Sequence, residues 1–437
     1  MMMDHPLLIT TMLHRARKLF PKKEIFSRCL DQDHRLNYSQ FYERVCRLAN
    51  VLESLGIKPG DRVGSFAWNN HRHLELYFAV PCSGAVLHTI NLRLFPDQLV
   101  YVINHAEDKV LFIDEDLAPL LARIADQLTT VEKYIILSDK EELPELDLPN
   151  AVSYEKLLAD ASPVYDFPED LDENSPAAMC YTTATTGAPK GVAYTHRSIY
   201  LHSMMMALPN TIGVEERDVI LPVVPMFHAL AWGIPFSGVW MGSKLVLPGR
   251  LLTPEAISKL IESEQVTLPV GVPTIWIGLH QHLESGASYD FSDVRYIVNG
   301  GSAISKSLIK SFDENYGIKV LHGYGMTETS PGVLFSHVKS YMDEWDSHYR
   351  YAQQYKQGLL VPGLEMKIIN EDGVAVNWDG IEMGELCLRG PWIAGSYYKD
   401  PERSAEAFRD GWLHTGDIVT IDEEGYVFIQ DRAKDLI

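Results

Sequence analysis

Residues 181–191 read YTTATTGAPKG and lie between two apolar runs, 176–181 and 191–194, that have the composition of β-strands. Glycine lets backbone N–H groups turn inward, and the threonine hydroxyls add further donors, so such a loop can hold an anion. Lys190 adds a mobile positive charge suited to phosphate. The spacing is not the GxxxxGK[ST] of a P-loop, and a strand follows instead of a helix. Taken alone, the stretch is also compatible with a polar hairpin turn.

Strands and helices alternate on both sides of this loop. Strands are expected at 62–67, 85–90, 109–114 and 133–138 before it, and the helices include 117–128 and, after the loop, 229–241. The alternation predicts an α/β fold with two doubly wound, mainly parallel sheets flanked by helices, whose ligands lie at the carboxyl ends of strands.

From about residue 358 the sequence pattern changes to short strands separated by EDG, GE and EEG turns. This pattern predicts a small antiparallel β-barrel. The expected organisation is therefore a first α/β subdomain with an N-terminal helical segment at 1–175, a second at 176–335, a β-barrel subdomain at 336–432 and a hinge at 433–437.

Composition excludes several classes of protein. The 38 basic residues stand against 59 acidic ones in 437, a formal charge of −21, which argues against non-specific binding to nucleic acid. Five scattered cysteines fit a reducing compartment better than a disulfide framework. No run of 18 apolar residues occurs, so no transmembrane segment is predicted. We expect a cytoplasmic protein whose partners are small molecules.

Three further stretches carry candidate chemistry. In HGYGMTET (322–329), Tyr324 can lie against a flat base, Thr327 can donate to a phosphate, and Glu328 offers a hard carboxylate for Mg²⁺. NGGSA (299–303) ends a predicted strand and offers backbone contacts. Asp417 of DGWLHTGD can accept both hydroxyls of a ribose, with Arg432 as a second ribose contact. Each stretch alone is equally compatible with an ordinary strand-end turn, a capping aspartate or a surface ion pair.

Together and in this order, these stretches resemble the AMP-forming acyl-CoA synthetases, whose signature reads YTSGTTGxPKG. Thr183 and Ala184 depart from it. The resemblance covers nearly the whole chain, most closely the medium- and long-chain fatty-acid–CoA ligase branch. It implies that ATP and coenzyme A are substrates and that Mg²⁺ is a cofactor. It also implies that the acid is converted first to an acyl-adenylate and then to a thioester.

The resemblance also assigns roles to residues. It places Lys190, His228, Thr327 and Glu328 in catalysis, with Glu328 on the metal. It implies that ATP is bound by the following residues: Thr182, Thr183, Thr185, Thr186, Gly187, Gly300, Gly301, Ser302, His322, Gly323, Tyr324, Gly325, Asp417 and Arg432. Lys434 matches the family's hinge. The family's small C-terminal domain is expected to be absent from these 437 residues, which would then be nearly inactive alone, and a homodimer through the amino-terminal segment is implied.

The acid is the least constrained part of the prediction. The stretches 227–242 and 270–279 contain no charged side chain, so a dicarboxylate would lack a buried cation. We expect an aliphatic tail beside Trp232, Gly238 and Val270, although ordinary helix core is equally apolar. The alternatives are an aryl-CoA ligase, a ligase that stops at the acyl-adenylate, and a non-catalytic nucleotide or acyl-adenylate binding module.

Overall fold

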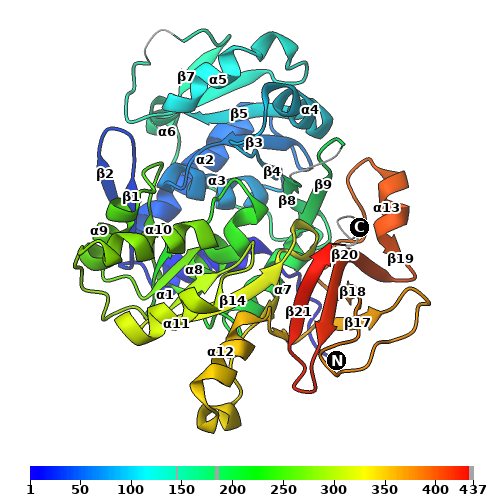
Figure 1. Ribbon diagram of the computed structural model, residues 1–437. Helices are drawn as coiled ribbons and strands as arrows, with labels where there is room; N and C mark the ends of the chain where they lie inside the picture. The colour runs from blue at the N-terminus through cyan, green and yellow to red at the C-terminus, as the bar shows by residue number, and fades with distance from the viewer. Residues whose placement is uncertain (144–145, 183–186, 433–437) are drawn as a thin grey trace. The chain divides into compact units, whose positions relative to one another are not determined.

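The computed structural model describes residues 1–143, 146–182 and 187–432 (Figure 1). The chain divides into two compact units, each described here by itself. The first unit comprises Met1–Ser203, Glu215–Arg217 and Val224–Leu251, and the second comprises Met204–Val214, Asp218–Val223 and Leu252–Ile437.

A seven-stranded sheet forms the centre of the first unit (Figure 1). Its strands run parallel except the last pair, and their order across the sheet is β7 (Ala151–Ser153), β6 (Lys133–Leu137), β5 (Asp108–Asp114), β3 (Arg62–Phe66), β4 (Val86–Thr89), β8 (Pro176–Tyr181) and β9 (Gly191–Thr195). These strands are buried almost end to end, as expected of a parallel sheet covered by helices on both faces.

Three helices of the first unit, α2 (Tyr38–Ser54), α3 (His71–Cys82) and α6 (Tyr154–Asp160), begin directly after a residue whose side chain caps them. The Asn70 side chain accepts a hydrogen bond from the backbone N–H of His73 at 3.0 Å and so starts α3, which is buried along its whole length. A parallel pair, β1 (Glu24–Arg28) with β11 (Lys244–Leu247), and the edge strand β2 (Asp33–Asn37) complete its strands. Its other helices are α1 (Ile9–Leu19), α4 (Pro96–Ala106), α5 (Ala118–Ala122) and α8 (Ile234–Met241), while α7 (His196–Met206) runs from this unit into the next.

The second unit also contains a parallel sheet. Its strands β10 (Val219–Pro222), β12 (Leu268–Gly271), β13 (Tyr296–Asn299) and β14 (Lys319–Gly325) are parallel, and β15 (Gly332–Phe335) and β16 (Leu359–Leu360) add antiparallel pairs. The helices of this unit are α9 (Pro254–Glu264), α10 (Pro273–Glu284), α11 (Lys306–Tyr316), α12 (Ser347–Tyr355) and α13 (Pro401–Ala407).

The same unit carries the antiparallel sheet that the turn pattern predicts. Strands β17 (Glu365–Ile369), β18 (Gly384–Arg389) and β20 (Trp412–Ile421) follow one another across it, and β20 also pairs with β19 (Phe408–Arg409) and β21 (Val427–Arg432). The predicted α/β class, with parallel sheets and a separate antiparallel half-barrel, is confirmed. The subdomain boundaries expected from the sequence stay a prediction.

Two local expectations are wrong, and one pair of strands was not expected. The helix expected at 117–128 is only α5, because Ile124 departs from helical backbone and short 3₁₀ turns flank it. The helix expected at 229–241 begins at Ile234, because the preceding residues turn with the opposite hand. The pair β1–β2 was not anticipated, because β2 is short and largely exposed and so lacks a clear alternation.

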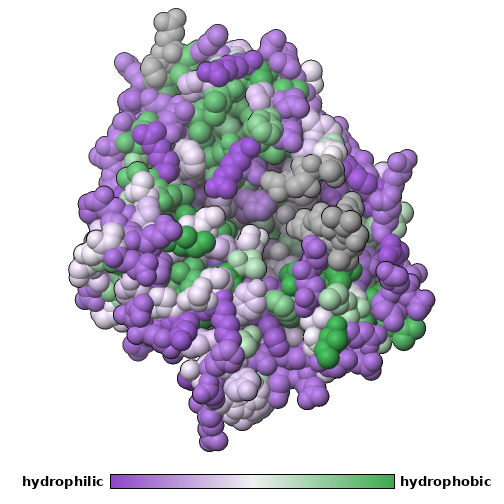
Figure 2. All heavy atoms as spheres, in the orientation of Figure 1, coloured by the Kyte–Doolittle hydropathy of each residue, from purple (hydrophilic) through white to green (hydrophobic). Residues whose placement is uncertain are grey.

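The face drawn in Figure 2 is mostly hydrophilic, as its purple side chains show. Apolar side chains gather at the lower right of this face, near the position of β17 in Figure 1. The connection from β17 to β18 exposes four large ones, Val374, Trp378, Ile381 and Met383. Within the described ranges, no helix is both long and apolar enough to cross a membrane.

Candidate functional site

The threonine-rich loop leaves the edge of the first unit's sheet as a hairpin. Tyr181 of β8 pairs with Gly191 of β9, and just beyond them the backbone N–H of Thr182 donates to the Lys190 carbonyl at 2.9 Å. The backbone N–H of Lys190 donates in turn to the Thr182 hydroxyl oxygen at 3.2 Å. The neck of the loop is therefore closed on both sides. Gly187 is exposed, with a φ of +85° that favours glycine.

Several predicted loop residues lie outside the described residues, namely Thr183, Ala184, Thr185 and Thr186. Lys434 of the predicted hinge also lies outside them, and of Arg432 only the backbone is described. Their predicted roles stay predictions.

Asn69 and Tyr77 hold the segment that leads to His228. The Asn69 side chain donates to the Val224 carbonyl and accepts from the Met226 N–H, both at 2.8 Å, and the Tyr77 hydroxyl donates to the Met226 carbonyl at 2.5 Å. His228 follows with its Nδ1 buried and without a hydrogen-bond partner among the described residues. Burial and the charge of Arg93 lower the pKa of His228, so the imidazole is neutral at pH 7.

A left-handed turn follows His228 directly. The φ angles are 44° at Ala229, 51° at Leu230, 46° at Ala231, 59° at Trp232 and 75° at Gly233. A left-handed conformation costs a side-chain-bearing residue roughly 1–2 kcal/mol, because Cβ crowds the carbonyl oxygen. Such strain persists only where the surroundings fix it, so the packing around the segment holds these four consecutive residues in the left-handed conformation.

The second unit brings NGGSA and HGYGMTET together at one sheet edge. Asn299, the last residue of β13, stands opposite His322 of β14. Gly300, Gly301 and Ser302 follow at the carboxyl end of β13, with Gly301 and Ser302 exposed. His322 is buried, and its Nδ1 lies 3.0 Å from the Tyr355 carbonyl oxygen, so its environment indicates a structural link to α12. Gly323 and Gly325 continue the same strand.

Gly325 has a packing reason that the sequence did not reveal. A Cβ at this position would lie 1.8 Å from the Pro331 carbonyl oxygen, so any side chain is excluded by backbone alone. This contact explains the glycine without its predicted role in binding ATP, which stays a prediction.

Tyr324 and Asp417 come from different sheets of the second unit and meet. The Tyr324 hydroxyl donates to Oδ2 of Asp417 at 2.5 Å, and the Asp417 carboxylate is buried. Burial, followed by the charge of Asp417, raises the pKa of Tyr324, so the phenol keeps its proton. In β21, Arg432 stands opposite Asp417. Three predicted adenosine contacts are thus gathered at one place.

Glu328 is held by residues that the sequence did not single out. Thr327 and Glu328 form a 3₁₀ turn after β14, and both side chains are buried. The Tyr397 hydroxyl donates to Oε1 of Glu328 at 2.8 Å, and the Ala394 N–H donates to the Glu328 backbone carbonyl at 2.8 Å. Burial and the charge of Glu328 raise the pKa of Tyr397. A carboxylate oriented in this way is a suitable ligand for a hard cation such as Mg²⁺.

The predicted tail residues are less well supported. Trp232 is partly exposed within the left-handed turn, and Val270 is a buried residue of β12. Gly238 is buried in α8, which packs against α1. Four residues further on, a Cβ at Gly242 would lie 2.2 Å from the ring of Phe20. That contact explains Gly242, which follows α8 with a φ of +78°, and the role of Gly238 stays a prediction.

The comparison with known proteins matches this arrangement to one family. The AMP-binding enzyme family matches residues 13–398. The chain belongs to the AMP-binding enzymes. Among curated AMP-binding relatives, a long-chain-fatty-acid–CoA ligase of Thermus thermophilus is 43% identical over 438 residues, covering 100% of this chain and 79% of that protein.

Two further AMP-binding relatives differ in the acid that their names give. A medium-chain-fatty-acid–CoA ligase of Ectopseudomonas oleovorans is 41% identical, covering 100% of this chain and 79% of its own. A 3-methylmercaptopropionyl-CoA ligase of Ruegeria lacuscaerulensis is also 41% identical, covering 100% and 80%. Among solved structures, a fatty acyl CoA synthetase of Mycobacterium tuberculosis superposes with a TM-score of 0.83 at 29% identity, covering 99% of this chain and 79% of that one.

Proposed function

We propose that this AMP-binding enzyme activates a fatty acid with ATP and transfers the acyl group to coenzyme A. The observation that carries the proposal is the 43% identity, over the whole chain, to a long-chain-fatty-acid–CoA ligase. The pairing of Tyr324 with Asp417 and the oriented carboxylate of Glu328 support it. No GxSxG nucleophile is needed, because neither step requires a covalent enzyme intermediate.

The reaction has two displacements. In the first, a carboxylate oxygen of the acid forms a bond to the α-phosphorus of ATP, and the bond from that phosphorus to pyrophosphate breaks. In the second, the thiol of coenzyme A loses its proton and bonds to the acyl carbon, and AMP leaves. Both depend mainly on positioning and on electrostatic stabilisation of oxygen atoms that gain charge.

We assign roles to residues on that basis. The phosphates are contacted by Lys190, the threonine loop and Thr327. Tyr324 stacks on adenine, and Asp417 and Arg432 bind ribose. His228 lies beside the carboxylate of the acid. The backbone of Gly300–Ser302 and of His322–Gly325 lines the nucleotide. Glu328 would hold Mg²⁺, which neutralises phosphate charge when bound. Its buried, hydrogen-bonded carboxylate fits that ion.

Pyrophosphate exchange over a panel of acids tests the function. Exchange that depends on medium- or long-chain fatty acids, followed by thioester formation with coenzyme A, is expected. Exchange with aromatic acids, or exchange without thioester, would favour the aryl-CoA or acyl-AMP ligase. Nucleotide binding without any exchange by the full-length protein would favour a binding module.

Asp417→Ala should weaken ATP binding by at least about tenfold, since a hydrogen bond to a charged group contributes roughly 1.5–3 kcal/mol. Calorimetric titration of ATP measures the affinity, and the melting temperature shows whether the fold survives. Unchanged affinity in a stable variant would remove Asp417 from the nucleotide site.

Gly238→Leu separates the tail channel from helix packing. If Gly238 lines the channel, the variant should lose activity by roughly fourfold for each carbon excluded, since each buried methylene contributes about 0.8 kcal/mol. If the glycine only allows α8 to approach α1, the variant should have a lower melting temperature, and its activity should fall by the same factor for every acid. The measurement is kcat/KM for acids of increasing length, and a uniform loss contradicts the channel.

We further propose a cytoplasmic location, because five scattered cysteines fit a reducing compartment, and a homodimer formed through the amino-terminal segment. Size-exclusion chromatography with light scattering tests the dimer.

A further inference from the structure

The strand that carries Asp417 contains a bulge. Strands β18 and β20 pair antiparallel, but Glu385 stands opposite Ile418 whereas Cys387 stands opposite His414. Two steps along β18 therefore match four along β20, and the additional residues lie within Thr415–Asp417. Gly416 has a φ of +73°, which suits glycine. Bulges bend a strand and change the direction of the side chains next to them.

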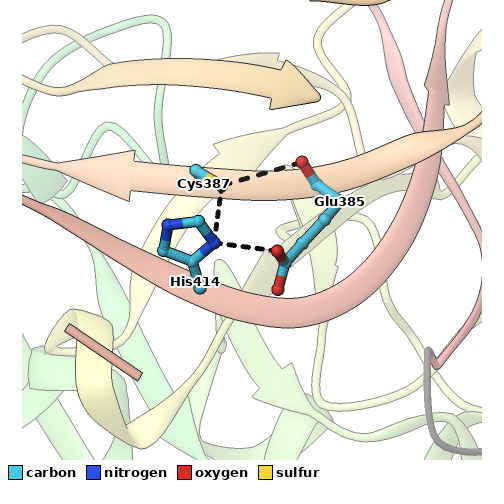
Figure 3. Close-up of side chains that lie close together, drawn as sticks. All are labelled: Glu385, Cys387 and His414. Atoms are coloured by element: carbon cyan, nitrogen blue, oxygen red, sulfur yellow. Dashed lines mark hydrogen bonds and ion pairs between the residues drawn. The ribbon is translucent and has the colours of Figure 1, made fainter. Parts of the chain in front are cut away.

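One carboxylate holds this bulge from the opposite strand. Oε1 of Glu385 accepts the backbone N–H of Gly416 at 3.1 Å, and Oε2 lies 2.8 Å from Nδ1 of His414 (Figure 3). The Thr415 hydroxyl donates to the Leu386 carbonyl at 2.8 Å. Glu385 thus contacts β20 on both sides of Thr415.

Glu385, Cys387 and His414 also have the residue types of a transition-metal site. However, Nη2 of Arg409 lies 3.0 Å from Nδ1 of His414 and 3.6 Å from Oε2 of Glu385. A guanidinium cation therefore already interacts with two of the three ligand atoms. Burial and the charge of Glu385 raise the pKa of Cys387 to about 12, so the thiol is protonated. These contacts indicate that Glu385, Cys387 and His414 form a hydrogen-bonded cluster that links β18 to β20, and they disfavour a metal centre.

The bulge sets the direction of Asp417. The Asp417 N–H donates to the Thr415 hydroxyl oxygen at 3.1 Å, and its carboxylate accepts from Tyr324 at 2.5 Å. We propose that Glu385 is a positioning residue for ATP, because its carboxylate fixes the bulge that aims Asp417 at Tyr324 and at the ribose. The inference rests on the proposed function.

The test compares nucleotides that differ only at the ribose. Calorimetry measures the Kd of each variant for ATP and for 2′,3′-dideoxy-ATP. The Kd for the dideoxy nucleotide divided by the Kd for ATP is the discrimination ratio, which reports the contribution of the ribose hydroxyls. Glu385→Ala should weaken ATP binding by about tenfold, as for loss of one hydrogen bond to a charged group, and should bring the ratio close to one. The glutamine side chain in Glu385→Gln can still accept the hydrogen bond from the Gly416 N–H. Its ATP affinity and discrimination ratio should therefore lie between those of Glu385→Ala and of the wild type. Glu365→Ala is the matched control, because Glu365 pairs with Arg389 at the surface of the same sheet.

Four outcomes decide the matter. A discrimination ratio unchanged in both Glu385 variants overturns the inference, and Glu385→Gln keeps the test open if the alanine variant does not fold. Equal loss for both nucleotides with a lowered melting temperature shows a purely structural role and also overturns it. If Asp417→Ala leaves the ratio unchanged, the ribose assignment itself is wrong. If Asp417→Ala abolishes the ratio while Glu385→Ala does not, only the role of Glu385 fails.

Discussion

Replacing Tyr397 with phenylalanine is expected to raise the Mg²⁺ concentration needed for half-maximal pyrophosphate exchange by about 10–100-fold, the usual effect of removing a group that orients a metal ligand. The Tyr397 hydroxyl donates to Oε1 of Glu328 at 2.8 Å, and both side chains are buried. Without that donor the carboxylate can turn away from the position in which it would meet the ion. Glu328→Gln should have the larger effect, because it removes the charge itself.

Tyr398→Phe provides the matched control. Tyr398 is the next residue along the chain, and its ring lies beside Lys399. It should leave the Mg²⁺ requirement unchanged. If Tyr397→Phe lowers the melting temperature but not the response to Mg²⁺, the hydroxyl only stabilises the fold, and the role proposed for it is wrong.

Acid should destabilise the first unit strongly. Burial lowers the pKa of His73 to about 4, of His196 to about 4 and of His202 to about 3. Unfolded histidine binds a proton below about pH 6.5, whereas these folded side chains do so only near pH 3–4. The unfolded state therefore holds more protons in this window, and the free energy of unfolding falls as the pH drops from 6.5 towards 4. At pH 5 each histidine costs roughly 2 kcal/mol, and the three together about 6 kcal/mol.

Melting temperatures at pH 8 and pH 5 test this prediction. His202→Gln should reduce the fall in melting temperature by several degrees, since about 2 kcal/mol corresponds to roughly 4–8 °C in a protein of moderate size. His5→Gln removes an exposed histidine and should behave as the wild type. Equal falls in both variants would show that His202 does not contribute to the acid sensitivity.

The fold was predictable where periodicity is strong. Buried strands such as β5 and capped helices such as α3 have patterns that local physics decides. The left-handed turn was not predictable, because ALAWG is as apolar as helix core and hydrophobic pattern carries no information about backbone hand. The short strand β2 was not predicted from the sequence, because it has no alternating buried face.

The candidate site divides in the same way. Tyr324, Glu328 and Asp417 were singled out as candidates because each lies in a stretch with its own chemical pattern. Tyr397 and Glu385 were missed, since a tyrosine in a loop and a glutamate on a strand have no local signature. Their contacts arise from pairing between distant segments, which only the folded chain shows.

The left-handed turn after His228 limits how this protein can be altered. Residues 229–232 all require a backbone conformation that β-branched side chains resist and that glycine and asparagine accept most readily. A library that randomises these positions to change acid preference would lose most of its members to misfolding, whatever their fit to a new substrate. Engineering is better directed at neighbouring positions with right-handed backbone, and natural variation in this segment should avoid β-branched residues.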